Sequence, residues 1–255
     1  MFGAIIGDIA GSSYEFNNTS DYRFPMFGPT KDFTDDTICT VAVADAILNH
    51  KSYQDALREW CRRYPHPMGE YGSFFFNWVM RPDPHPYNSF GNGSAMRVSP
   101  VAWLFDDEPT VRQQAAQSAA VTHNHPEGIK GAVVIAVAIF RMRTADVKSP
   151  EIFERVAKEF YGDDCFSHLP ERGVFDVTCQ GCVPLALHIA SSAADFEDAV
   201  RQAVVYGGDT DTVGAIVGSL AEPMYGIPEE MTTAAEAYLP EEMKRIISQY
   251  ESAIS

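Results

Sequence analysis

Two segments that are apolar on nearly every face constrain the fold of this chain more than any other feature. Gly131–Phe140 and Val213–Leu220 consist almost entirely of apolar and small residues. A helix without a polar face belongs in the middle of a globular protein. The glycines and alanines in both segments would let neighbouring helices approach closely. We therefore expect two central helices with other helices packed around them.

The remainder of the chain shows helical periodicity and almost no strict alternation. Over residues 53–64 apolar side chains recur at three- and four-residue steps, with charged side chains opposite. Asp35–Leu48 starts with Thr34 as an expected N-cap and two acids in its first turn. Caps and prolines predict further helices over residues 94–104, 109–122, 126–143, 150–160, 183–191, 195–205, 211–222, 229–238 and 240–253. We expect residues 65–86, which are rich in proline, to be irregular. The prediction is an all-α protein with one domain over residues 1–255.

Composition excludes several classes of function. The formal net charge of −16 argues against a nucleic-acid surface, because phosphate backbones are met by clustered Lys and Arg. No apolar run is long enough to span a bilayer, and no basic leader precedes the first apolar stretch. The five cysteines are not densely spaced, which favours reduced thiols. We expect a cytoplasmic monomer.

Two acidic motifs open two of the predicted helices, Thr34-Asp35-Asp36-Thr37 and Asp209-Thr210-Asp211-Thr212. The first has a simple structural explanation as a capped helix start, but the second has more acids and hydroxyls than a cap requires. Carboxylate and hydroxyl oxygens are ligands that Mg²⁺ and Mn²⁺ prefer. Consecutive helical residues point about 100° apart, so Asp35 and Asp36 would bind two different ions, or one would bind an ion and the other a water. Brought together, the motifs would form a two-metal hydrolytic centre.

Three other motifs carry weaker signals. Phe90-Gly91-Asn92-Gly93-Ser94 precedes a predicted helix, and its backbone amides could hold phosphate oxygens. His123 and His125 have no clear zinc spacing, so a polar contact to substrate or a loop role is the better interpretation. Cys179 and Cys182 form a single C-x-x-C, for which two ordinary thiols are favoured over a zinc or redox site. Glu15, taken alone, is most simply a solvated acid at a helix end.

Taken in order, the motifs resemble those of the ADP-ribosylglycohydrolases, and the resemblance covers residues 3 to 228. The motifs that carry it are Gly7-Asp8 with Glu15, Thr34-Asp35-Asp36-Thr37, Gly91-Asn92-Gly93-Ser94-Ala95-Met96-Arg97, Thr122-His123 and Gly208-Asp209-Thr210-Asp211-Thr212. The resemblance implies a compact, orthogonal all-helical domain with a cleft that binds two Mg²⁺ or Mn²⁺ ions.

The resemblance also implies a role for particular residues. The metal ligands would be Thr34, Asp35, Asp36, Asp209, Asp211 and Thr212. The catalytic acids would be Glu15, Asp35 and Asp36, with Glu15 at the mouth of the site. The residues that bind ADP-ribose would be Ser89, Phe90, Gly91, Asn92, Gly93 and His123, with Phe90 near the adenosine.

The leading hypothesis is therefore a metal-dependent hydrolase that removes ADP-ribose from a modified protein, with ADP-ribosyl-arginine as the expected linkage. Cleavage at the anomeric carbon would build oxocarbenium character, as in other glycoside hydrolyses. The alternatives are a hydrolase of O-linked or small-molecule ADP-ribose derivatives, and a relative that only binds ADP-ribose or is structural, as in lens crystallins. A third class, other helical metal hydrolases, fits poorly because the chain has neither a His-Asp dipeptide nor a third aspartate after Asp35-Asp36.

Overall fold

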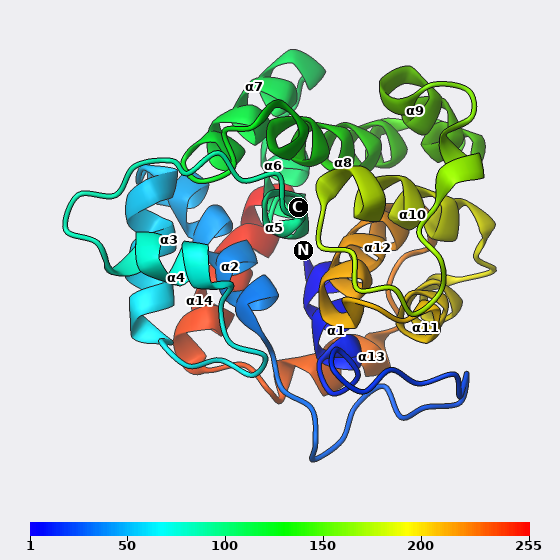
Figure 1. Cartoon of the computed structure of the whole chain (residues 1–255), viewed down its shortest axis with the longest axis horizontal. Coiled ribbons are helices and arrows are strands. Elements are labelled where there is room, and N and C mark those ends of the chain that lie inside the picture. The colour runs from blue at the N-terminus through cyan, green and yellow to red at the C-terminus, as the bar shows by residue number, and fades with distance from the viewer.

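The structure, a computed structural model, describes residues 1–255 and contains helices but no sheet (Figure 1). The predicted all-α fold class is confirmed. The helices are α1 (Phe2–Gly11), α2 (Asp35–Leu48), α3 (Tyr53–Arg63), α4 (Ser73–Met80), α5 (Gly93–Met96), α6 (Ser99–Leu104), α7 (Glu108–Ala120), α8 (Pro126–Thr144), α9 (Glu151–Tyr161), η1 (Cys165–His168, a 3₁₀ helix), α10 (Cys179–Ser192), α11 (Phe196–Tyr206), α12 (Thr210–Tyr225), α13 (Glu229–Glu236) and α14 (Glu241–Ile254).

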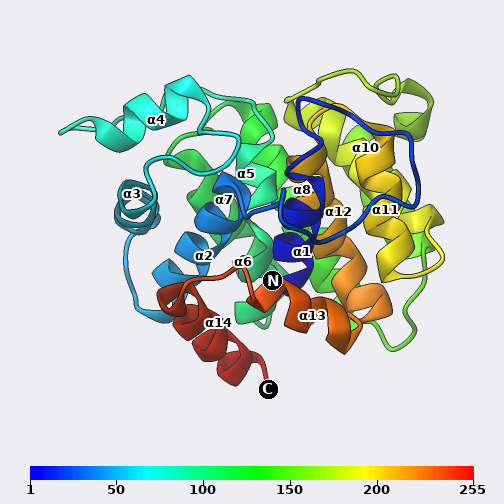
Figure 2. The same ribbon diagram turned by 90° about the horizontal axis from the view of Figure 1, so that it is seen from below.

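Helices α1 and α12 lie side by side and antiparallel at the centre of the molecule (Figures 1 and 2). Glycine makes this possible, because the two backbones are in direct contact. A Cβ added to Gly3 would lie 2.1 Å from the carbonyl oxygen of Gly218, and one added to Gly11 would lie 2.2 Å from that of Thr210. The end of α1 is therefore held against the start of α12, where the second acidic motif lies.

The remaining helices surround this pair, and 68 buried residues form one hydrophobic cluster. Helix α8, the other predicted central helix, is buried along most of its length and packs on α7, α9 and α12. A single hydrophobic cluster is typical of one domain. The assignment of residues 1–255 to one domain stays a prediction. No helix has the length and apolar character needed to cross a bilayer.

The structure differs from the predictions made from the sequence at three places. The predicted helix over residues 94–104 is two short helices, α5 and α6. Pro100 lies at the start of α6 and has no N–H to donate to the carbonyl of Met96, where α5 ends. The stretch 65–86, expected to be irregular, contains α4, which buries Phe75, Trp78 and Val79. Burial of these apolar side chains stabilises the helix between the flanking prolines. Helix α10 also starts earlier than expected, at Cys179.

Candidate active site

The two acidic motifs, which lie far apart in the sequence, meet at the start of α2 and the start of α12. The Thr212 hydroxyl donates to Asp36 Oδ2 at 3.1 Å, and both side chains are buried. Thr34 caps α2 by accepting a hydrogen bond from the backbone N–H of Asp36 at 3.2 Å. The predicted convergence of the motifs is confirmed.

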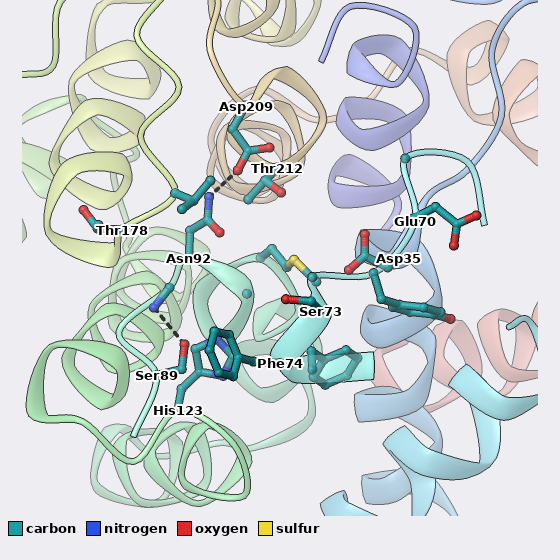
Figure 3. A pocket seen from close by; sticks show the side chains of 18 of the residues that line it. Asp35, Glu70, Ser73, Phe74, Ser89, Asn92, His123, Thr178, Asp209 and Thr212 are labelled. Atoms are coloured by element: carbon teal, nitrogen blue, oxygen red, sulfur yellow. Dashed lines mark hydrogen bonds between the residues drawn. The ribbon is translucent and has the colours of Figure 1, made fainter. Parts of the chain in front are cut away.

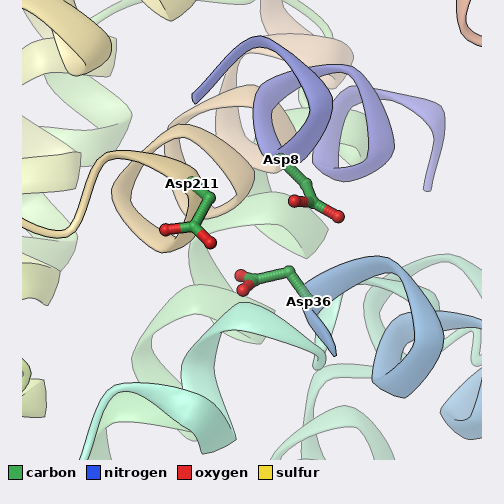
Figure 4. Close-up of side chains that lie close together, drawn as sticks. All are labelled: Asp8, Asp36 and Asp211. Carbon is green, nitrogen blue, oxygen red and sulfur yellow. The ribbon is translucent and has the colours of Figure 1, made fainter. Parts of the chain in front are cut away.

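Asp8, which the sequence analysis did not select as a site residue, lies at the centre of this cluster. Carboxylate oxygens of Asp8, Asp36 and Asp211 come within 4.8 Å of one another (Figure 4). Asp8 Oδ2 accepts hydrogen bonds from the backbone N–H groups of Thr34 and Thr37, each at 3.0 Å, and from the Thr37 hydroxyl. Asp8 thus ties α1 to the start of α2. A lone acid inside an otherwise apolar helix was the signal that could have identified it.

A second group joins Glu15 to the α12 motif. Carboxylate oxygens of Glu15, Asp209 and Asp211 also lie within 4.8 Å of one another. Asp209 stands at the N-cap position of α12 but makes no capping hydrogen bond. Its Oδ2 instead accepts from the side-chain amide of Asn92 at 2.6 Å. Asp211 belongs to both groups, so it would bridge two adjacent cation positions.

Asp35 lies apart from these two groups. Its carboxylate is partly buried and lines the neighbouring cavity, while that of Asp36 is directed into the buried cluster. The expectation that consecutive acids in a helix would point in different directions agrees with this arrangement.

The cluster has the properties of an oxygen site for divalent cations. Asp8 Oδ1, Asp36 Oδ1, Asp211 Oδ1 and Glu15 Oε2 are buried and have no hydrogen-bond partner in the protein. Burial raises the pKa of Asp8 to about 6, and burial with repulsion from Asp209 and Asp8 raises the pKa of Glu15 to about 7. Burial and neighbouring carboxylates raise the pKa of Asp35, Asp36 and Asp211 well above their usual range. Divalent cations would offset the repulsion between the carboxylates and would be ligated by the oxygens that have no hydrogen-bond partner.

A cavity of about 720 Å³ adjoins this cluster and is bordered by Glu15, Asp35, Asp209, Asp211 and Thr212. Figure 3 shows Asp35, Asp209 and Thr212 among the residues that line it. Its volume lies within the range of small-molecule sites. All the residues predicted to bind ADP-ribose border the same cavity, namely Ser89, Phe90, Gly91, Asn92, Gly93 and His123. The structure therefore brings the two sets of predicted residues to one cleft.

The glycine loop, formed by residues 90–94, is held in place by residues from α10 and the segment before it. The backbone N–H of Asn92 donates to Val177 O at 2.8 Å, and the thiol of Cys179 donates to Gly91 O at 3.0 Å. The Cys182 thiol donates to Asp176 O at 2.9 Å. The groups of side chains able to hold a metal contain neither cysteine. Both thiols donate to backbone carbonyls, and the interpretation of the C-x-x-C as two ordinary thiols stays a prediction.

Exposed aromatic rings gather at the mouth of the cavity. Phe16 and Phe175 are 76% and 47% exposed and stack with ring centroids 5.9 Å apart. Phe90 is exposed beside His125, with ring centroids 5.2 Å apart. Phe74 is exposed and stacks on Tyr87. Of these rings, only Phe90 was predicted from the sequence, because it belongs to the Phe90-Gly91-Asn92-Gly93-Ser94 motif. Phe16, Phe74 and Phe175 belong to none of the predicted motifs.

Comparison with known proteins gives this site its class. Residues 1–253 match the sequence model of the ADP-ribosylglycohydrolase family, so the chain belongs to that family. It is accordingly a hydrolase that acts on ADP-ribose linkages.

Individual relatives agree with this class. The chain is 22% identical to human ADP-ribosylhydrolase ARH3 over 93% of this chain and 88% of the relative. It is 27% identical to the ADP-ribosyl-[dinitrogen reductase] glycohydrolase of Rhodospirillum rubrum over 57% of this chain and 50% of the relative. A solved structure described as an ADP-ribosylglycohydrolase-related protein complex superimposes with a TM-score of 0.77 at 23% identity, covering 100% of this chain and 96% of the other. That structure shares the fold.

Proposed function

We propose that this protein is a divalent-cation-dependent hydrolase that releases ADP-ribose from modified protein side chains, with ADP-ribosyl-arginine as its substrate. The observation that carries the proposal is the position of the buried carboxylate cluster beside a cavity lined by a glycine loop and His123. The cluster would hold two Mg²⁺ or Mn²⁺ ions. Its ligands would be Thr34, Asp36, Asp209, Asp211 and Thr212, together with Asp8. Asp35 would bind from the side of the cavity, which its carboxylate lines.

Bound divalent cations would hold the ribose hydroxyls and make a water nucleophilic near neutral pH. The residues of the chain orient the reaction around them. Asn92 holds Asp209 in place through its side-chain amide. Glu15 borders the cavity beside Asp211, where its carboxylate orients a water and accepts a proton from it. Asp35 borders the cavity on the α2 side and assists in this orientation.

The charge of the cleft supports arginine as the modified residue. Glu15, Asp35 and Glu70 border the cavity, and Arg97 is its one bordering Lys or Arg residue. A guanidinium leaving group is a cation and is favoured beside carboxylates. A seryl or acetyl leaving group carries no positive charge and gains nothing from them. We further propose that the protein acts as a monomer in the cytoplasm.

The test is hydrolysis of ADP-ribosyl-arginine, ADP-ribosyl-serine and O-acetyl-ADP-ribose, each with Mg²⁺, with Mn²⁺ and with a chelator. We expect release of ADP-ribose from the arginine conjugate that stops on chelation and returns when the cation is restored. Faster release from the serine or acetyl compound would reassign the linkage while keeping the reaction class. Binding of ADP-ribose without turnover of any of the three would contradict a catalytic role.

A further inference from the structure

Arg97 is a buried cation for which the structure provides no carboxylate partner. Its side chain is 1% exposed, and no Asp or Glu forms an ion pair with it. Its Nη2 donates to Ser118 O at 3.1 Å and to the Thr122 hydroxyl at 2.8 Å. Arg97 also borders the cavity. Isolated buried charges are costly, so a cation retained in this position requires an explanation.

The Thr122 hydroxyl lies between Arg97 and His123 and decides which ring nitrogen of His123 carries the proton. Thr122 Oγ1 lies 2.7 Å from His123 Nδ1, and Thr122 is fully buried. Arginine can only donate, so the hydroxyl accepts from Arg97 and its own hydrogen is directed to Nδ1. If Nδ1 carried the proton instead, the hydroxyl hydrogen would have no acceptor in a buried site. The structure therefore favours the tautomer protonated at Nε2.

His123 Nε2 makes no hydrogen bond within the protein and faces the glycine loop. A Cβ added to Gly93 would lie 3.2 Å from Nε2, and one added to Gly91 would lie 3.6 Å from it. His123 borders the cavity near Ser89 (Figure 3). A ligand oxygen beside Gly93 would be within reach of the Nε2 proton. The backbone N–H groups of Gly91 and Asn92 already donate to Ser89 Oγ and Val177 O. Gly91 and Gly93 leave room for that contact.

We propose that Arg97 and Thr122 are positioning residues that hold His123 as the neutral Nε2–H tautomer, so that it donates a hydrogen bond to an anionic oxygen of a nucleoside diphosphate. This inference rests on the proposed function for the identity of the ligand. The tautomer matters because the other form would direct a lone pair at the same oxygen and repel it. Burial and the charge of Arg97 lower the pKa of His123 well below its usual range, which keeps the ring neutral.

The first test reads the tautomer directly. In protein labelled with ¹⁵N-histidine, the ring nitrogens of His123 are assigned by comparison with His123→Gln. We expect Nε2 protonated and Nδ1 unprotonated at neutral pH. Thr122→Ser, which keeps the hydroxyl, should give the same spectrum, while Thr122→Val should give a mixture of tautomers. A wild-type ring protonated at Nδ1, or at both nitrogens, would overturn the proposal even if the variants did not fold.

The second test asks whether Thr122 acts through His123. Calorimetric titration with ADP-ribose should show a Kd about three- to tenfold weaker for Thr122→Val than for Thr122→Ser, the loss expected for one hydrogen bond. Thr122→Val combined with His123→Ala should bind no more weakly than His123→Ala alone, because the two residues act as a unit. Additive losses would mean that Thr122 acts independently of His123, and the positioning role would be wrong.

The two tests separate this inference from the proposed function. If wild-type protein fails to bind ADP-ribose but shows the Nε2–H tautomer that Thr122→Val disturbs, the proposed function fails and the positioning of His123 stands. If ADP-ribose binds normally and Thr122→Val changes neither the spectrum nor the Kd, the positioning role fails and the proposed function stands.

Discussion

Gly7 and Gly214 face each other with no side chain between the two backbones. A Cβ added to Gly7 would lie 1.9 Å from the carbonyl oxygen of Gly214, and one added to Gly214 would lie 2.5 Å from that of Gly7. Asp8 follows Gly7 directly, and Asp211 lies about one helical turn before Gly214. The close approach of α1 and α12 therefore sets the distance between two carboxylates of the candidate metal cluster.

Gly7→Ala should destabilise the protein by about 3 kcal/mol or more, because backbone rather than a flexible side chain occupies the space. The variant should also lose cation binding, since α1 must move away from α12. Thermal unfolding with and without Mg²⁺ measures both effects. Gly28→Ala is the control, because a Cβ there meets no atom within 4 Å. A Gly7→Ala protein as stable as this control would contradict the packing.

Asp36→Asn should have opposite effects on stability and activity. The substitution removes one charge from a buried cluster of like charges, so the metal-free protein should become more stable. It also removes a proposed ligand, so hydrolysis should fall at least about 100-fold while the helical circular-dichroism spectrum is kept. Turnover near that of the wild type would show that Asp36 is not a ligand.

Asp8 is expected to hold the start of α2 in position for cation binding, through the hydrogen bonds that it accepts from Thr34 and Thr37. In Asp8→Ala the backbone N–H groups of Thr34 and Thr37 lose their acceptor, at a cost of about 1–3 kcal/mol for each buried donor. Asp8→Asn keeps an acceptor but lacks the charge, so it should fold while Mg²⁺ affinity falls about 10–100-fold. Calorimetry of Mg²⁺ binding to both variants separates the role of Asp8 as a hydrogen-bond acceptor from the role of its charge. Unchanged Mg²⁺ affinity in Asp8→Asn would show that the charge of Asp8 is not needed for cation binding.

The metal-free protein should lose stability as pH rises. The folded pKa values of Asp8 and Glu15 are about 6 and about 7, above the ordinary values of these groups. For a raised pKa, the stabilising contribution is complete below the unfolded pKa and is lost as pH rises through the folded pKa. In chelator, Tm should therefore fall between about pH 4, near the unfolded pKa values, and about pH 7, near the folded ones. Saturating Mg²⁺ should reduce this fall, and an identical pH profile with and without Mg²⁺ would argue against cation binding at the cluster.

Phe90→Ala should weaken ADP-ribose binding about tenfold, as expected for loss of one stacking ring, and should change kcat less than KM. Phe90 is 44% exposed at the mouth of the cavity. Val147→Ala is the control, because Val147 is exposed and does not border the cavity. A change confined to kcat would place Phe90 at the reacting bond instead of the nucleotide.

The amino-acid sequence by itself determined the helical class, most helix boundaries and the residue types of the site. Period, caps and prolines act over a few residues, so α2 and α8 could be predicted closely. The acidic motifs could be recognised for the same reason, since each is a short local pattern.

Only the tertiary structure decided which of these patterns come together. Asp8 joined the cluster because paired glycines bring α1 against α12, and nothing local to Asp8 records that contact. The link from Arg97 through Thr122 to His123 likewise depends on α5 lying beside the end of α7. The chemistry of each side chain follows from the identity of its residue, whereas the distances between remote residues follow from how whole helices pack.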